Sequence, residues 1–266
     1  MSEVRAAAEA GQALGPAGPS PERVRRRELL RGSAVYLVTE EALSAGRTSE
    51  AVAESALRAG VRVVQVREKE GSARRALEVA VNLRDLTRKF GALLIVDDRI
   101  DIALACDADG VHVGQQDLPI QLARLLMGND ALVGLSITDA EQLATDDAAE
   151  ADYLGVGAVF PTDSKGDATL TGLLLLTAAR AATRAPIVAI GGIDATNAGL
   201  AVAAGADSLA VITAVTRAAD PAAAVAALTA AVAGAAEARP VADAAGAAVA
   251  TEADAGVVAP VEDARK

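Results

Sequence analysis

Aromatic residues are scarce in this sequence. They make up 2% of its 266 residues, and tryptophan is absent. Proteins that bind single-stranded nucleic acid stack the bases on exposed aromatic side chains, and a net charge of −11 opposes contact with a phosphate backbone. We therefore expect no nucleic acid partner, although a local basic cluster remains compatible with a small phosphate ester.

Cysteine and long apolar runs are scarce as well. The single cysteine, Cys106, excludes an internal disulfide framework and a cysteine-rich zinc site. No apolar run reaches the length of a membrane span, and the amino terminus lacks the apolar core of a signal peptide. We expect a soluble, cytoplasmic protein with no membrane partner. The sequence leaves the oligomeric state open, including a homo-oligomer.

Histidine occurs once. His112 lies between two valines in an expected strand, which favours a core residue over a general base. On this interpretation Ser136 has no histidine partner for a catalytic triad. The sequence also contains no Walker A motif and no dinucleotide-binding fingerprint. No side-chain nucleophile is therefore expected.

The two ends of the chain differ in composition from the middle. Residues 1–31 begin with a segment rich in Ala, Gly and Pro, and we expect a disordered or loosely helical extension. The four arginines between Glu22 and Glu28 are more typical of a solvated helix face than of a nucleic-acid arm. Residues 235–266 are expected to be a disordered Ala-rich tail. Residues 32–234 then form the single folded domain.

Short apolar runs alternate with segments of helical period eight times within this domain. The expected strands are residues 34–38, 61–66, 93–96, 110–113, 132–135, 153–156, 187–190 and 209–212. The expected helices are residues 49–58, 73–89, 100–106, 118–127, 140–150, 173–182, 195–203 and 222–232. Eight units without an obvious topological switch predict an α/β fold, the (β/α)8 TIM barrel.

Local signals at the helix ends agree with this pattern. Gly60, Gly91 and Gly205 follow expected helices, where a left-handed residue is favoured. Thr138 and Glu141 have the spacing of a capping box at the start of the helix expected over residues 140–150.

Two carboxylates follow consecutive strands, Asp98 after residues 93–96 and Asp117 after residues 110–113. At the carboxyl edge of a barrel they would face one cavity and share a hard cation. The alternative is that each aspartate caps the helix that follows it, as aspartate commonly does. The spacing alone favours the capping alternative.

Three further segments carry groups suited to anions. Alternation after the second strand points Gln65, Arg67 and Lys69 the same way, either toward a phosphate or into rim ion pairs with Glu68 or Glu70. Residues 160–167 resemble an oxyanion cradle, or else form a surface loop. The glycines at 191–192 and the segment 212–213 follow the last two strands, where barrels commonly bind phosphate, although a double glycine also suits a tight turn.

Motifs across residues 33–220 resemble, in order and spacing, those of the thiamine phosphate synthase family. The matching segments are residues 65–69 (QVREK), 98–99 (DR), 108–119 (ADGVHVGQQDLP), 134–136 (GLS), 161–168 (PTDSKGDA) and 189–193 (AIGGI). The resemblance implies a transferase that condenses 4-amino-5-hydroxymethyl-2-methylpyrimidine diphosphate with a thiazole phosphate. The products are thiamine phosphate and diphosphate, and Mg²⁺ assists the departure of diphosphate.

The resemblance also implies the site residues. Asp98 and Asp117 are the implied magnesium ligands. The residues implied in catalysis are Arg67, Lys69, Ser136 and Lys165. The residues implied in substrate binding are Gln65, Val66, Arg67, Glu68, Lys69, Asp97, Ser136, Thr162, Asp163, Ser164, Lys165, Gly192, Ile212 and Thr213.

The chain departs from the family pattern at two notable positions. Asp97 stands where asparagine is usual, and Thr138 stands where a histidine is common. A thiazole tautomerase-like paralogue is one alternative function, but it does not need the metal and diphosphate residues that are present. A non-catalytic phosphate-binding regulator on the same barrel is the other.

Overall fold

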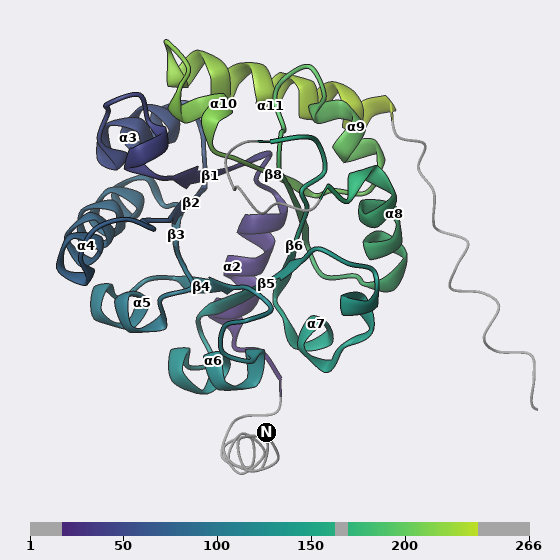
Figure 1. Cartoon of the computed structure of the whole chain (residues 1–266), viewed down its shortest axis with the longest axis horizontal. Helices are drawn as coiled ribbons and strands as arrows, with labels where there is room; N and C mark the ends of the chain where they lie inside the picture. The colour runs from purple at the N-terminus through teal and green to yellow at the C-terminus, as the bar shows by residue number, and fades with distance from the viewer. Residues whose placement is uncertain (1–17, 163–169, 239–266) are drawn as a thin grey trace, which may run out of the picture.

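The barrel predicted from the alternating pattern is present. The computed structural model describes residues 18–162 and 170–238, and its eight parallel strands close into a barrel in sequence order, with β8 paired to β1 (Figure 1). The strands are β1 Val35–Thr39, β2 Val63–Val66, β3 Leu93–Asp97, β4 Gly110–Val113, β5 Leu132–Ile137, β6 Tyr153–Val156, β7 Ile187–Ile190 and β8 Ser208–Val211.

Helices surround the barrel, and one helix lies across its end. They are α2 Pro21–Arg31, α3 Ser49–Arg58, α4 Ala73–Phe90, α5 Ile100–Cys106, α6 Ile120–Met127, α7 Asp146–Glu150, α8 Gly172–Ala182, α9 Ala198–Ala203, α10 Thr213–Thr216 and α11 Pro221–Ala238, with 3₁₀ helices η1 Glu41–Leu43 and η2 Glu141–Ala144. Within residues 18–162 and 170–238, no helix is long and apolar enough to cross a membrane.

The helix predicted over residues 140–150 is broken in two. The Thr145 side chain accepts a hydrogen bond from the Ala148 N–H at 3.2 Å, which starts α7 as a separate helix after η2. The predicted capping box between Thr138 and Glu141 is also wrong, because the Glu141 N–H donates to Asp139 Oδ1 at 2.8 Å.

The last helix is longer than predicted. Helix α11 continues to Ala238, and Ala235 packs against the hydrophobic core. The predicted start of the disordered tail at residue 235 is therefore wrong, since α11 still has a surface to cover there. Residues 239–266 lie outside the described residues.

Two apolar layers hold the fold together. The outer layer fills the space between the strands and the surrounding helices, and the inner layer fills the barrel itself. The inner layer consists of Leu30, Tyr36, Val38, Val63, Leu93, Ile95, Leu132, Tyr153, Val188 and Ala210. Leu30 belongs to α2, so this helix contributes to the barrel core.

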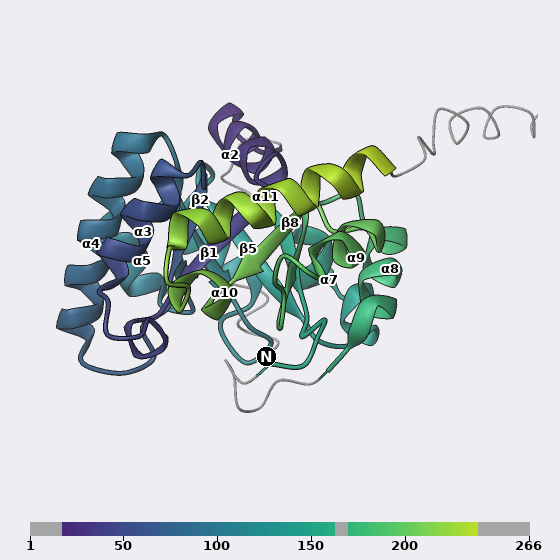
Figure 2. The ribbon, with the colours of Figure 1, turned by 90° about the horizontal axis from the view of Figure 1, so that it is seen from above.

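Helix α2 lies across the end of the barrel at which the strands begin (Figure 2). Ser20 caps it by accepting a hydrogen bond from the Arg23 N–H at 3.1 Å, and Leu30 is completely buried. Residues 21–31 are thus a docked helix, and for them the prediction of a disordered or loosely helical extension is wrong. Residues 1–17 lie outside the described residues.

Three aspartates that stand just before strands contact this helix. Asp109, Asp152 and Asp207 each stand one residue before a strand. In each, Oδ2 accepts a hydrogen bond from a backbone N–H of the preceding strand; the donors are Leu94 at 2.9 Å, Val133 at 2.8 Å and Ile187 at 2.8 Å. The other carboxylate oxygen is directed toward α2.

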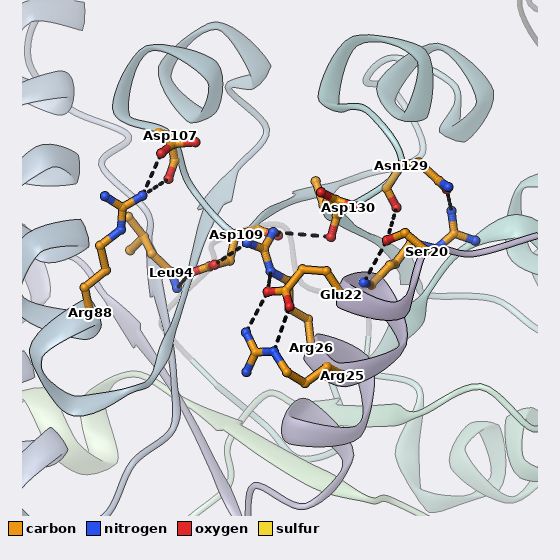
Figure 3. Close-up of polar contacts among 12 residues, drawn as sticks. Ser20, Glu22, Arg25, Arg26, Arg88, Leu94, Asp107, Asp109, Asn129 and Asp130 are labelled. Atoms are coloured by element: carbon orange, nitrogen blue, oxygen red, sulfur yellow. Dashed lines mark hydrogen bonds and ion pairs between the residues drawn. The ribbon is translucent and has the colours of Figure 1, made fainter. Parts of the chain in front are cut away.

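Arginines of α2 meet these oxygens. Arg26 Nη2 lies 3.0 Å from Asp109 Oδ1, and Arg23 Nε lies 3.1 Å from Asp152 Oδ1. Figure 3 shows Arg26 directed toward Asp109, while Arg25 turns back to Glu22. The prediction of a solvated arginine face therefore fits Arg25 alone of these three residues, because Arg23 and Arg26 also contact aspartates that are distant in sequence.

Candidate active site

A cavity of about 850 Å³ opens at the carboxyl end of the barrel strands. It brings together most of the residues that the sequence singled out for substrate and metal binding. Those that line it are Gln65, Arg67, Lys69, Asp97, Asp98, Asp117, Ser136, Thr162, Gly192, Ile212 and Thr213. They come from loops and strand ends all around the barrel, which is where TIM barrels place their active sites.

Two predicted side chains point away from this cavity. Val66 is buried in the outer apolar layer, and the Glu68 carboxylate accepts a hydrogen bond from Ser49 Oγ at 2.9 Å. Alternation along β2 and the residues after it explains both placements, since neighbouring side chains face opposite sides. Their predicted substrate contacts are therefore wrong at the level of side chains. Asp163, Ser164 and Lys165 lie outside the described residues.

Two cations of the cavity, Arg67 and Lys69, are engaged by carboxylates. Arg67 forms an ion pair with Glu40, and Lys69 Nζ lies 2.9 Å from Asp97 Oδ2 and also contacts Asp98. Burial lowers the pKa of Lys69, but Asp97 and Asp98 outweigh it and raise this pKa above its ordinary value. Lys69 therefore stays charged. The expected alternative of rim pairs with Glu68 or Glu70 is wrong, because among the described residues the partners of Arg67 and Lys69 are Glu40, Asp97 and Asp98.

Asp98 and Asp117 do not act as helix caps, so that alternative is also wrong. Helix α5 is preceded by Arg99 and α6 by Pro119, and neither helix has a side-chain cap. Asp98 has a φ of 57°, a left-handed conformation that aspartate tolerates better than most residues. Asp117 Oδ2 accepts a hydrogen bond from the Gly114 N–H at 2.7 Å. Both carboxylates instead line the cavity.

These two carboxylates suit a hydrated divalent cation. Burial raises the pKa of Asp117, and the negative charge of Asp98 raises it further, so a cation between the two carboxylates would relieve their repulsion. Within the described ranges, no group of three or more His, Cys, Asp or Glu side chains is placed to hold a metal. A pair of hard oxygen ligands fits Mg²⁺, which usually keeps several waters and adds phosphate oxygens.

His112 is part of the cavity wall. Its Nε2 lies 2.9 Å from Ser136 Oγ, and its Nδ1 lies 3.1 Å from the Tyr153 hydroxyl. The expectation that Ser136 has no histidine partner is therefore wrong. Gly134 and Gly155 make room for the ring, because a Cβ on either would lie 2.6 to 2.8 Å from His112 atoms. These glycines, one strand and two strands away, were the sequence signal for an inward histidine.

A hydrogen-bonded chain continues from His112 across the barrel. The Tyr153 hydroxyl lies 3.0 Å from the Tyr36 hydroxyl, which accepts a hydrogen bond from Gln65 Nε2 at 3.1 Å. Burial raises the pKa of both tyrosines, so the two hydroxyls stay protonated at neutral pH. Sequence reasoning did not foresee that Tyr36, His112 and Tyr153 form the polar floor of the cavity.

The glycines after β7 bring two loops together. Gly191 and Gly192 have φ values of 98° and 64°, and a Cβ on Gly192 would overlap Pro161 O. Any other residue at 192 would thus be both strained and obstructed. The double glycine therefore places this loop directly against the segment that follows β6, with Thr162 beside it in the cavity lining.

Comparisons with known proteins agree with this geometry. The family model described as thiamine monophosphate synthase matches residues 35–215. Similar proteins include the thiamine-phosphate synthases of Chloroflexus aurantiacus, 52% identical over 62% of this chain and 76% of that protein, and of Natronomonas pharaonis, 49% identical over 62% of this chain and 78% of that protein. A solved structure, the thiamine phosphate pyrophosphorylase of Pyrococcus furiosus, is 38% identical with a TM-score of 0.71 over 77% of this chain and 98% of that one. By sequence and by fold, this chain belongs to the thiamine monophosphate synthase family.

Proposed function

We propose that this chain is a transferase, a thiamine-phosphate synthase. It condenses 4-amino-5-hydroxymethyl-2-methylpyrimidine diphosphate with a thiazole phosphate and releases diphosphate. The observation that carries the proposal is the single cavity in which Arg67, Lys69, Asp98 and Asp117 meet the glycine-rich loop at Gly192. That cavity has a cationic and carboxylate side for a diphosphate and a separate glycine-lined side for a second anion.

The pyrimidine diphosphate belongs on the side of β2, β3 and β5. Arg67 and Lys69 exchange their carboxylate partners for diphosphate oxygens, and Gln65 and Ser136, which line the same cavity, bind the pyrimidine. Guanidinium and ammonium groups stabilise the charge that develops as the carbon–oxygen bond to diphosphate breaks. We assign Asp97 to the same substrate, although its charge opposes an anion.

Asp98 and Asp117 hold Mg²⁺ in this proposal. When bound, the ion neutralises the leaving diphosphate. The protein's own part is to hold the two carboxylates toward one point, through the Gly114 N–H that fixes Asp117 and the left-handed backbone at Asp98.

The thiazole phosphate belongs on the side of β6, β7 and β8. Thr162, Gly192, Ile212 and Thr213 line that side, where a hydroxyl and close backbone approach suit a phosphate. The thiazole nitrogen attacks the pyrimidine methylene carbon, and diphosphate leaves with the electron pair of the broken bond. Orientation and charge stabilisation are sufficient for this substitution, so no nucleophilic side chain is needed.

The two alternative functions fit the cavity less well. A thiazole tautomerase has no use for the cations and paired carboxylates on the diphosphate side. A regulator that only binds phosphate does not need the polar floor that lies between the two anion sides. The cytoplasmic location that we propose rests on the single, buried Cys106, because such a chain needs no oxidising compartment.

The decisive experiment supplies the two substrates with and without Mg²⁺. Thiamine phosphate and diphosphate should appear in equal amounts, and chelation of Mg²⁺ should stop both. Conversion of a thiazole tautomer without diphosphate release would instead identify a tautomerase. Saturable binding of both anions without any product would identify a regulator.

A further inference from the structure

A second cavity lies at the opposite end of the barrel from the active site. It has a volume of about 270 Å³ and is lined by residues of α2, α6 and α7 and by the residues that precede β6. Three guanidinium groups line it, those of Arg23, Arg27 and Arg124. The lining also includes two carboxylates, Asp152 and Glu150.

The charges around this cavity do not balance locally. The buried Asp152 is fully engaged, since Oδ1 lies 3.1 Å from Arg23 Nε while Oδ2 contacts Arg124 and accepts the Val133 N–H at 2.8 Å. Glu150 is exposed at the rim. Among the residues that the structure describes, the Arg27 side chain forms no ion pair or hydrogen bond, and its Nε is buried from solvent.

The arginines also repel one another. Burial lowers the pKa of Arg124, and the nearby positive charge of Arg23 lowers it further, against the opposing effect of Asp152. Arg23 Nε, although close to Asp152, lacks a hydrogen bond of good geometry and is buried as well. Three arginines and two carboxylates leave the lining with an excess of positive charge, which a bound anion would balance.

We propose that this cavity binds a tetrahedral oxyanion of the phosphate type. Guanidinium forks match the oxygens of phosphate, and the guanidinium groups of Arg23, Arg27 and Arg124 that line the cavity would hold such an anion. The ligand is either free inorganic phosphate or the larger diphosphate. Since Arg23 and Arg27 belong to α2 and Arg124 to α6, the bound anion ties the docked helix to the barrel wall. This inference does not depend on the proposed catalytic function.

The test follows the arginine Nε–H signals by nuclear magnetic resonance, because the active site also binds phosphates and a bulk measurement would mix the two. Inorganic phosphate is titrated into the full chain, and diphosphate is titrated separately. We expect saturable shifts of the Arg23 and Arg27 signals, with the tighter-binding anion identifying the source. Arg27→Gln should weaken binding at this site at least about tenfold, the loss of one charge-assisted contact. Arg25→Gln, on the exposed side of the same helix, is the matched control and should leave it unchanged.

A stability measurement separates a ligand site from a structural role. In phosphate-free buffer, Arg27→Gln should raise the melting temperature or leave it unchanged, because it removes an uncompensated charge. Phosphate should then raise the melting temperature of the unmodified chain more than that of the variant. The proposal is overturned if neither anion shifts the Arg27 signal, if Arg27→Gln melts lower without phosphate, or if phosphate binds only after Glu150→Gln, which would mean that Glu150 already fills the cavity.

Discussion

Lys69 Nζ lies 2.9 Å from Asp97 Oδ2, so the cation that we assign to the diphosphate is engaged by a carboxylate before any substrate arrives. Arg67 Nε is also near Asp97, at 3.6 Å. Arg99, two residues further along the chain, donates instead to Asp101 Oδ1 at 2.8 Å. Asp97 is thus an internal competitor for the substrate's binding groups.

We predict that Asp97→Asn raises kcat/KM for the pyrimidine diphosphate by about threefold to tenfold. A carboxylate about 5 Å from a substrate anion costs about 3 kcal/mol at an effective dielectric of about 20, and Lys69 and solvent reduce that penalty. The rise should shrink as salt or Mg²⁺ increases. Lower activity with a greater Mg²⁺ requirement would show instead that Asp97 helps to hold the metal.

We predict that Asp98→Asn and Asp117→Asn each lower kcat at least about a hundredfold without unfolding the protein, because each removes one charged ligand of a shared cation. Asparagine is preferable to alanine at 98, since it tolerates the left-handed backbone there. Steady-state rates over a range of Mg²⁺ concentrations, together with circular dichroism, provide the measurement. Activity close to that of the unmodified chain at low Mg²⁺ would contradict the metal assignment.

The raised pKa of Asp117 predicts a pH-dependent gain in stability for Asp117→Asn. The folded protein binds this proton more tightly than the unfolded chain does. The fold therefore loses stability as the pH rises from the pKa of the unfolded chain, and the loss is complete above the folded pKa. In a chelator, the variant should melt higher than the unmodified chain at neutral pH. This difference should vanish below the pKa of the unfolded chain.

Asp101→Asn is the control of opposite sign for that experiment. The hydrogen bond from Arg99 lowers the pKa of Asp101, so its ionised form stabilises the fold at neutral pH. This variant should melt at a slightly lower temperature than the unmodified chain at neutral pH, and at the same temperature in acid. A uniform shift of both variants at every pH would rule out the electrostatic explanation.

Tyr153→Phe should destabilise the fold by about 1–3 kcal/mol in urea denaturation, because His112 Nδ1 and the Tyr36 hydroxyl both lose a buried partner. When Tyr36→Phe is added to Tyr153→Phe, it should lower the unfolding free energy by less than it does in the unmodified chain. The reason is that the first substitution has already removed the hydrogen bond that the two hydroxyls share. Strict additivity of the two changes would mean that the hydroxyls do not interact.

Leu30→Ala should cost about 2–5 kcal/mol of unfolding free energy, as for other fully buried leucines. Val24→Ala, on the exposed side of α2, should change it by less than about 0.5 kcal/mol. A chain that begins at residue 33 should likewise melt lower than one that begins at residue 18. Equal melting of these two chains would show that α2 does not contribute to the barrel core.

Local sequence signals were sufficient to predict the repeating strand and helix architecture. Strand β4 begins at Gly110 and helix α5 ends at Cys106, both where predicted, because a short apolar run is bounded by acidic or glycine residues at each end. The break at Thr145 was not predictable from periodicity, since a threonine that caps a new helix looks the same in sequence as one inside a helix.

The site was partly predictable for the same reason. Alternation correctly set Gln65, Arg67 and Lys69 on one side, because it depends only on neighbouring residues. The direction of His112 depends on space left by Gly134 and Gly155, on two other strands. The fit between the histidine ring and these glycines involves residues far apart in sequence, so local patterns do not predict it. The same holds for the ion pairs between α2 and distant aspartates.

The closed end of the barrel affects how substrates enter the active site and how products leave it. Leu30 of α2 and the tyrosine pair at 36 and 153 occupy the interior beneath the cavity, so the site is a blind pocket among the described residues. Within the part of the chain that the structure describes, substrates and products share the opening at the carboxyl end of the strands. In the reaction that we propose, the newly joined product and the released diphosphate therefore compete for one exit with the next incoming molecules. Inhibition by either product then depends on how fast it leaves through the shared opening as well as on its affinity.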